Sequence, residues 1–108
     1  MIHDFEKSTF QNRPAYRYIR EADDIPPIGS GSSIAKVKLF DPASSWTWYV
    51  AEYDAESREA FGLIDGHEKE LGYFSMIELV EYRSPMGLPL ERDIHYRPTP
   101  LAELQGVQ

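Results

Sequence analysis

The sequence predicts an α+β fold: a small antiparallel sheet of about four strands, with one capped helix packed on one face. Several short stretches alternate apolar and polar residues, which is the period of a half-buried strand. Turn-forming residues separate these stretches, as in a meander of antiparallel strands. One Ser-x-x-Glu capping box precedes a run of apolar residues with helical spacing.

The composition fits a single soluble domain. The chain has 108 residues, of which 42% are hydrophobic and 27% are charged. Cysteine is absent, which excludes a disulfide framework, a thiolate nucleophile and cysteine-ligated metal sites. The sequence shows no signal-peptide pattern and no apolar stretch of membrane-spanning length. We therefore expect a cytoplasmic protein that does not bind membranes.

Residues 1–34 are expected to form an N-terminal arm that ends in a surface loop. The apolar side chains of this segment, among them Phe10, Tyr18 and Ile19, follow no clear period. A Pro pair and a Gly/Ser run then favour a loop. The glycines are not followed by the lysine of a P-loop, so the run is not predicted to bind phosphate.

The domain itself is expected over residues 35–101, and two strands begin it. In residues 35–40 apolar side chains alternate with lysines, so one face of this strand is in water. Residues 45–53 have apolar side chains on both faces, which predicts a central strand. Its two faces are expected to carry Trp46, Trp48 and Val50 on one side, and Thr47, Tyr49, Ala51 and Tyr53 on the other.

A turn at residues 54–57 is expected to return the chain into an antiparallel strand at residues 58–64. Gly62 within that strand indicates a bulge, or a neighbour such as an indole packed onto bare backbone. Residues 71–74 form a short extended piece. A helix is expected at residues 75–83, where the Ser75 hydroxyl caps the N-terminus.

Alternation returns in residues 90–96, where Arg92 shares a side with apolar residues. An inward guanidinium needs a partner, so we expect Arg92 to form a buried ion pair or a cross-strand contact. The tail at residues 102–108 is expected to be frayed.

The net charge of −7 is concentrated in the middle of the chain, because residues 41–81 hold ten acidic and two basic residues. Such a field repels nucleic-acid backbones and attracts basic protein surfaces, although solvated acids also simply maintain solubility. We therefore expect a protein partner and no direct nucleic-acid binding. The predicted acidic surface comprises Glu52, Asp54, Glu56, Glu68 and Glu70.

No residue cluster predicts catalysis, a metal site or a cofactor. His67 lies beside three carboxylates, but neighbours in an extended loop point apart, so a site is not expected there. His3 and His95 show no ligand spacing.

Aromatic side chains are the best candidates for binding, because Trp and Tyr dominate interface hot spots. One helix cannot cover both faces of an aromatic strand, so the second face is expected to be closed by the arm, by a second copy of the chain in a homodimer, or by a partner. The candidate binding residues are Trp46, Trp48, Tyr49, Tyr53, Tyr73 and Arg92.

These residues resemble a small bacterial family of unknown function that is common on plasmids and other mobile elements. The resemblance covers about residues 25–101. It rests on Ser45-Trp46-Thr47-Trp48-Tyr49, Glu70-Leu71-Gly72-Tyr73-Phe74-Ser75 and Gly87-Leu88-Pro89-Leu90-Glu91-Arg92-Asp93. His67 departs from the family pattern, which has an apolar or aromatic residue there. The resemblance implies a stand-alone domain or a cargo gene of mobile DNA, without a reaction.

The leading hypothesis is a non-enzymatic protein-interaction or regulatory module, whose partner meets the acidic stretch or the aromatic face. One alternative is a DNA mimic or anti-restriction factor, which requires its carboxylates to be spaced along one surface. The other is a small enzyme or nucleotide-binding domain, with a cleft where Asp65, Glu70 and Arg92 converge.

Overall fold

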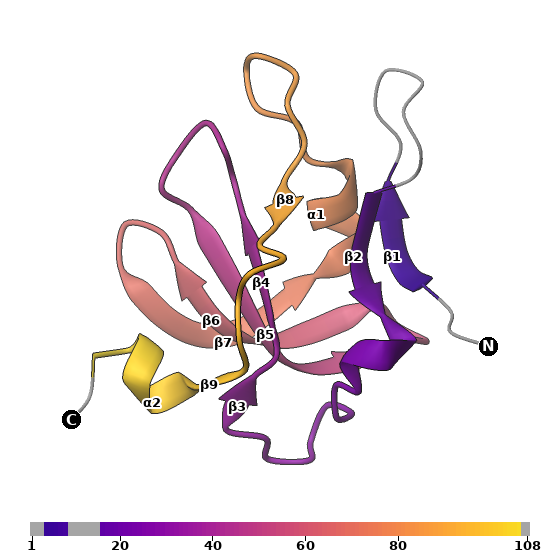
Figure 1. The fold of residues 1–108 in the computed structure, drawn as a ribbon, viewed down its shortest axis with the longest axis vertical. Coiled ribbons are helices and arrows are strands. Elements are labelled where there is room, and N and C mark those ends of the chain that lie inside the picture. The colour runs from indigo at the N-terminus through magenta and orange to yellow at the C-terminus, as the bar shows by residue number, and fades with distance from the viewer. Residues whose placement is uncertain (1–3, 9–15, 107–108) are drawn as a thin grey trace.

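The computed structural model describes residues 4–8 and 16–106. Its centre is a five-stranded antiparallel sheet of order β7-β6-β5-β4-β8 (Figure 1). Four consecutive strands form a meander, and β8 then returns to pair with β4. The five strands are β4 (Val37–Phe40), β5 (Thr47–Asp54), β6 (Glu59–Asp65), β7 (Lys69–Ser75) and β8 (Glu91–Arg92).

Two small ribbons and three short helical segments complete the described chain. One ribbon pairs β1 (Asp4–Ser8) with β2 (Tyr16–Arg20), and the other pairs β3 (Ile34–Ala35) with β9 (Thr99–Pro100). The helical segments are the 3-10 helix η1 (Glu21–Asp23), α1 (Met76–Glu81) and α2 (Leu101–Leu104).

The expected α+β fold, with four strands and one packed helix, is wrong: the architecture is mostly β. The main sheet has five strands, because the segment after α1 adds β8 beside β4. The helices α1 and α2 span only six and four residues, too few to form a layer over the sheet. Strands and loops, more than helices, therefore cover the faces of the main sheet.

Each face of the sheet carries its own core. The first core includes Tyr18 and Ile19 of β2, both 0% exposed, together with Val50 of β5 and Met76 of α1. The segment expected to be an arm thus contributes directly to this core. The second core is smaller, and α2 closes it through Leu101. In Figure 1 the β1–β2 ribbon lies beside α1 on the right, while α2 lies at the lower left.

The C-terminal segment differs from the sequence prediction in two ways. The tail is not frayed from residue 102, because α2 is helical and the Leu101 side chain is only 6% exposed. The strand expected at residues 90–96 is reduced to β8, and Ile94 is 73% exposed. The alternation therefore ends where pairing with β4 ends. Residues 107–108, His3 and Phe10 lie outside the described residues.

A register shift in the β5–β6 pair reorganises the central strand. The shift lies between Val50 and Glu52, and it places Tyr53 in the first core with Val50, against the expected alternation. The close approach predicted at Gly62 is confirmed, because an added Cβ would overlap the carbonyl oxygen of Tyr49. The expected indole contact occurs at another glycine: the ring of Trp46 lies on Gly66.

The start of α1 agrees with the prediction, and its end comes earlier. The Ser75 hydroxyl accepts a hydrogen bond from the Glu78 backbone N–H at 3.4 Å. The helix ends at Glu81, before residue 83, and Tyr82 is its C-cap. This early end turns Tyr82 toward the β4–β5 loop, where it forms part of a cavity described below.

Candidate functional site

A cavity of about 520 Å³ lies between the β4–β5 loop, the start of β5 and the segment after α1. Small-molecule sites in proteins commonly have volumes of roughly 300–1,000 Å³. We call it the aromatic cavity. Its lining consists of Asp41, Ala43, Ser44, Trp46, Trp48, Tyr82 and Pro85.

The two indoles reach the cavity because Trp46 and Trp48 are two residues apart in extended chain, so their side chains share a face. Their ring centroids are 6.0 Å apart, with planes tilted by 31°. Trp48 also packs against the first core. The ring of Trp46 lies on the backbone of Gly66, and the His67 ring approaches it edge-on at 5.4 Å. Both indoles are therefore half-buried, Trp48 by the first core and Trp46 by Gly66 and His67.

Asp41 supplies the cavity with a buried carboxylate that is only 4% exposed. It accepts hydrogen bonds from the Ala43 N–H at 2.9 Å, the Ser44 hydroxyl at 3.0 Å and the Tyr82 hydroxyl at 2.7 Å. Burial by itself raises the pKa of Asp41, but these hydrogen bonds outweigh burial and the pKa lies below 3.8. The hydrogen bond to Asp41 also raises the pKa of the Tyr82 hydroxyl. At neutral pH, therefore, the ionised Asp41 carboxylate accepts a hydrogen bond from the neutral Tyr82 phenol.

The remaining wall is set by the chain after α1. The buried Ser84 accepts a hydrogen bond from the Leu88 N–H at its hydroxyl, and its carbonyl accepts one from Gly87. Gly87 has φ of 82°, a left-handed conformation that favours glycine. Pro85, which lies in this turn, is part of the cavity lining.

A second exposed feature is the outer edge of β7. Among the described residues, β7 pairs only with β6, so it is an edge strand of the sheet. Leu71 is 45% exposed and Tyr73 is 58% exposed. They lie opposite Leu63 and Phe61 of β6, on the face of the second core, and the Tyr73 ring is 5.0 Å from Phe61.

The other candidate aromatic residues belong to the interior or to a different face. Tyr53 is 6% exposed and lies in the first core. Tyr49 lies on the second-core face, 5.8 Å from the ring of Tyr96, and burial raises its pKa. The structure thus brings Trp46 and Trp48 together and separates them from Tyr49, Tyr53 and Tyr73.

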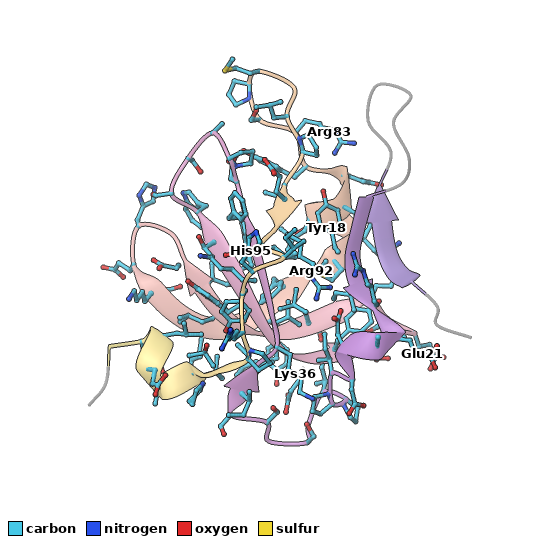
Figure 2. All side chains as sticks on the ribbon, in the orientation of Figure 1. Tyr18, Glu21, Lys36, Arg83, Arg92 and His95 are labelled. Carbon is cyan, nitrogen blue, oxygen red and sulfur yellow. The ribbon has the colours of Figure 1, made fainter. Side chains whose placement is uncertain are left out.

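Arg92 forms the buried ion pair that its pattern predicts. Its guanidinium donates to both carboxylate oxygens of Asp23, at 2.7 Å each, and to the Tyr18 carbonyl at 3.0 Å. Figure 2 shows Arg92 beside Tyr18, between β8 and the β1–β2 ribbon. Arg92 therefore has a structural role, because its guanidinium joins β8 to the segment of β2 and η1.

The five acidic residues predicted to form one acidic surface differ in exposure, and they do not all lie on the surface. Glu52 is 4% exposed and is bound by the Gly29 N–H, the Ser30 hydroxyl and the Ser32 N–H. Asp54 accepts bonds within its own turn. The exposed acids of the set are Glu56 in the β5–β6 turn, and Glu68 and Glu70 beside the β7 edge.

The cleft that the enzyme hypothesis requires is not formed. Asp65 and Glu70 lie on β6 and β7, whereas Arg92 lies on β8 at the opposite edge of the sheet. In the described part of the chain, no group of three or more His, Asp or Glu residues is arranged to hold a metal ion. None of the described helices is long and apolar enough to span a bilayer.

The chain matches the family described as protein of unknown function (DUF2958) over residues 11–104. The chain belongs to the DUF2958 family. No curated protein and no solved structure matches the chain. The resemblance noted from the sequence is therefore confirmed as membership in an uncharacterised family.

Of the residues that line the cavity of this DUF2958 protein, sequence reasoning found Trp46 and Trp48, and it missed Asp41 and Tyr82, whose side chains meet there. An Asp-Pro pair after a strand is typical of a turn, and Tyr82 follows a helix, so neither position carries a local signal of binding. Their contact joins residues 41 positions apart, and only the fold brings them together.

Proposed function

We propose that this DUF2958 protein is a protein-interaction module that binds an extended, basic segment of a partner along the outer edge of β7. The observation that carries the proposal is the outer edge of the seven-residue strand β7, which pairs with no other strand among residues 4–8 and 16–106, with Leu71 and Tyr73 exposed beside it. An edge of this length presents backbone donors and acceptors that an added strand can pair with.

The apolar residues favour an extended segment with alternating side chains. Leu71 and Tyr73 are two residues apart and point to the same face, so they form adjacent contact points for every second residue of an added strand. The Tyr73 ring packs on Phe61, which continues the apolar surface onto β6. Tyrosine at such a position contributes large contact area with few rotatable bonds.

The charges favour a basic partner over a second copy of the chain. Glu68 and Glu70 are exposed at the start of β7, within the stretch that holds most of the acidic excess. The ammonium of Lys69 between them is directed to the Leu104 carbonyl at 2.9 Å. Two such acidic edges would repel each other, whereas lysines or arginines of a partner would be attracted.

The test is selection from a random-peptide display library on the wild-type protein, with the Leu71→Lys, Tyr73→Lys double variant as counter-selection. We expect basic, alternating sequences whose binding weakens by about tenfold or more in the double variant. Amide NMR shifts on peptide addition should concentrate at residues 69–75. The matched control is Ile77→Lys, which changes an exposed residue of α1 and should bind as wild type.

Three results would overturn the proposal. The first is a failure to enrich any peptide, and the second is a set of peptides whose NMR shifts map away from β7. The third is concentration-dependent dimerisation of the wild-type chain that the double variant abolishes, because this assigns the edge to a second copy.

A further inference from the structure

We propose that the aromatic cavity is a binding site for an alkylated ammonium cation, the group shared by choline-like small molecules and methylated lysine side chains. The site is separate from the β7 edge, so it does not rest on the proposed function above. It combines two indoles, a tyrosine and a buried carboxylate in one hollow of suitable volume.

The aromatic walls are the first reason. A cation within about 6 Å of a ring centroid is attracted by the negative face of the ring, and tryptophan gives the strongest attraction. Trp46 and Trp48 have centroids 6.0 Å apart and planes inclined by 31°, so neighbouring ring surfaces line the same cavity. Because both indoles are partly buried, a bound cation would be shielded from water on that side, which strengthens the attraction.

The carboxylate is the second reason. Asp41 is 4% exposed, and no lysine or arginine of the described residues is paired with it. Hydrogen bonds alone keep this carboxylate ionised, so its negative charge remains available to attract a cation in the adjacent cavity. The aromatic cavity therefore favours positive ligands over neutral ones of the same shape.

The hydrogen bonds of Asp41 indicate which kind of cation fits. A carboxylate has about four acceptor positions, and donors from Ala43, Ser44 and Tyr82 occupy three of them. An unmodified ammonium or a guanidinium would leave most of its own donors without acceptors in this apolar lining. An alkylated ammonium has charge but few or no N–H donors, so it satisfies the carboxylate without that penalty.

Gly66 has a specific part in the site, because it allows the Trp46 ring to lie directly on the backbone. An added Cβ at Gly66 would overlap three ring atoms of Trp46. Gly66→Ala must therefore displace the indole that forms one wall, while leaving Asp41 and its partners unchanged in sequence. Gly66 and Trp46 are positioning and contact residues, respectively.

The first test uses the unmodified protein. Each of the two tryptophans gives one indole N–H signal in a 15N-labelled sample, and both signals report on the aromatic cavity. We expect both to shift saturably with choline in the millimolar range, as suits a ligand of few heavy atoms. The uncharged isostere 3,3-dimethyl-1-butanol should bind at least about tenfold more weakly than choline, because it has the shape of choline without the charge.

The second test uses variants. Asp41→Asn and Gly66→Ala should each weaken choline binding by about tenfold, while thermal unfolding confirms that each variant folds. The matched control is Glu56→Gln, which removes one acid in the β5–β6 turn, beyond the other end of β5, and should bind choline as wild type. Asp41→Asn removes a buried charge that Tyr82 contacts, so this variant could fail to fold. In that case Gly66→Ala, which leaves Asp41 in place, still tests the proposal.

The source of the cation is distinguished by a third arm that compares choline with a short peptide carrying trimethyllysine and with its unmodified lysine form. Tighter binding of the trimethyllysine peptide supports a protein side chain, and equal or tighter binding of choline supports a small molecule. The proposal is overturned if neither alkylated ligand shifts the indole signals, if the uncharged isostere binds equally, or if unmodified lysine binds as well as trimethyllysine. The β7 double variant should leave these titrations unchanged, so the two proposals fail independently.

Discussion

Arg92 and Asp23 are joined by two parallel hydrogen bonds of 2.7 Å, although they lie 69 positions apart in the chain. Arg92 belongs to the edge strand β8, and Asp23 ends the helix η1 after the β1–β2 ribbon. Their side chains are only 14% and 11% exposed. The pair therefore ties the N-terminal segment to the sheet at a place that water barely reaches.

Removing this ion pair should destabilise the protein strongly. We expect Arg92→Ala to lower the free energy of unfolding by about 3–5 kcal/mol, because Asp23 is left as a buried, unpaired charge. Arg92→Lys should lose less, since an ammonium keeps the charge but not the two parallel bonds. Urea unfolding followed by circular dichroism measures both. The exposed Arg97→Ala is the control, and an equal loss there would contradict the assignment.

Two glycines that face each other across β6 and β7 should respond differently to alanine. Gly62 is paired with Gly72, but a Cβ at Gly62 meets the Tyr49 carbonyl whereas a Cβ at Gly72 meets nothing within 4 Å. We expect Gly62→Ala to cost about 1–3 kcal/mol, and Gly72→Ala to be neutral or slightly stabilising. Chemical denaturation of both variants checks this, and similar values for the two would show that the β5–β6 approach is not close.

The buried Glu52 should make stability depend on pH. Burial raises the pKa of Glu52, but the hydrogen bonds from the loop at residues 29–32 outweigh it and lower the pKa below 4.5. The carboxylate therefore stabilises the fold at neutral pH, and this contribution is lost as pH falls through the lowered pKa. Glu52→Gln should cost about 1–3 kcal/mol at pH 7.

The difference between wild type and Glu52→Gln should shrink as the pH falls below 4.5. Thermal unfolding between neutral and acidic pH measures it, with the exposed Glu56→Gln as the control. If the difference in stability between the two proteins does not change with pH, the loop hydrogen bonds do not depend on the negative charge of Glu52.

The C-terminal helix α2 should be necessary for full stability. Leu101 is 6% exposed in the second core, so Leu101→Ala should cost about 2–5 kcal/mol through lost burial and a residual cavity. The matched truncation Ile94→Ala removes a side chain that is 73% exposed and should change stability by less than about 0.5 kcal/mol. No loss of stability in Leu101→Ala would place α2 outside the folded unit, and an equal loss in Ile94→Ala would show that the burial of Leu101 is not the cause.

Features that depend on neighbouring residues were predictable. The alternation in residues 35–40 and 45–53 anticipated β4 and β5, because the two-residue period of a strand is a local property. Ser75 marked the start of α1, since a cap needs only residues three positions apart. The inward Arg92 followed from its apolar neighbours on one side of the chain.

Pairings across long distances were not predictable. The β5 bulge moved Tyr53 to the other face because one extra residue reverses the alternation beyond it. The helix expected to cover the sheet proved to be six residues long, and β2 took over part of that role.

The local pattern of the chain by itself determined where most strands begin, where the helix starts and where the negative charge accumulates. The tertiary structure alone decided that Asp41 meets Tyr82 in a cavity lined by two indoles, and that β7 is an edge strand. The physical reason is that periodicity and capping act over a few residues, whereas a cavity or a sheet edge depends on how distant segments return to one another.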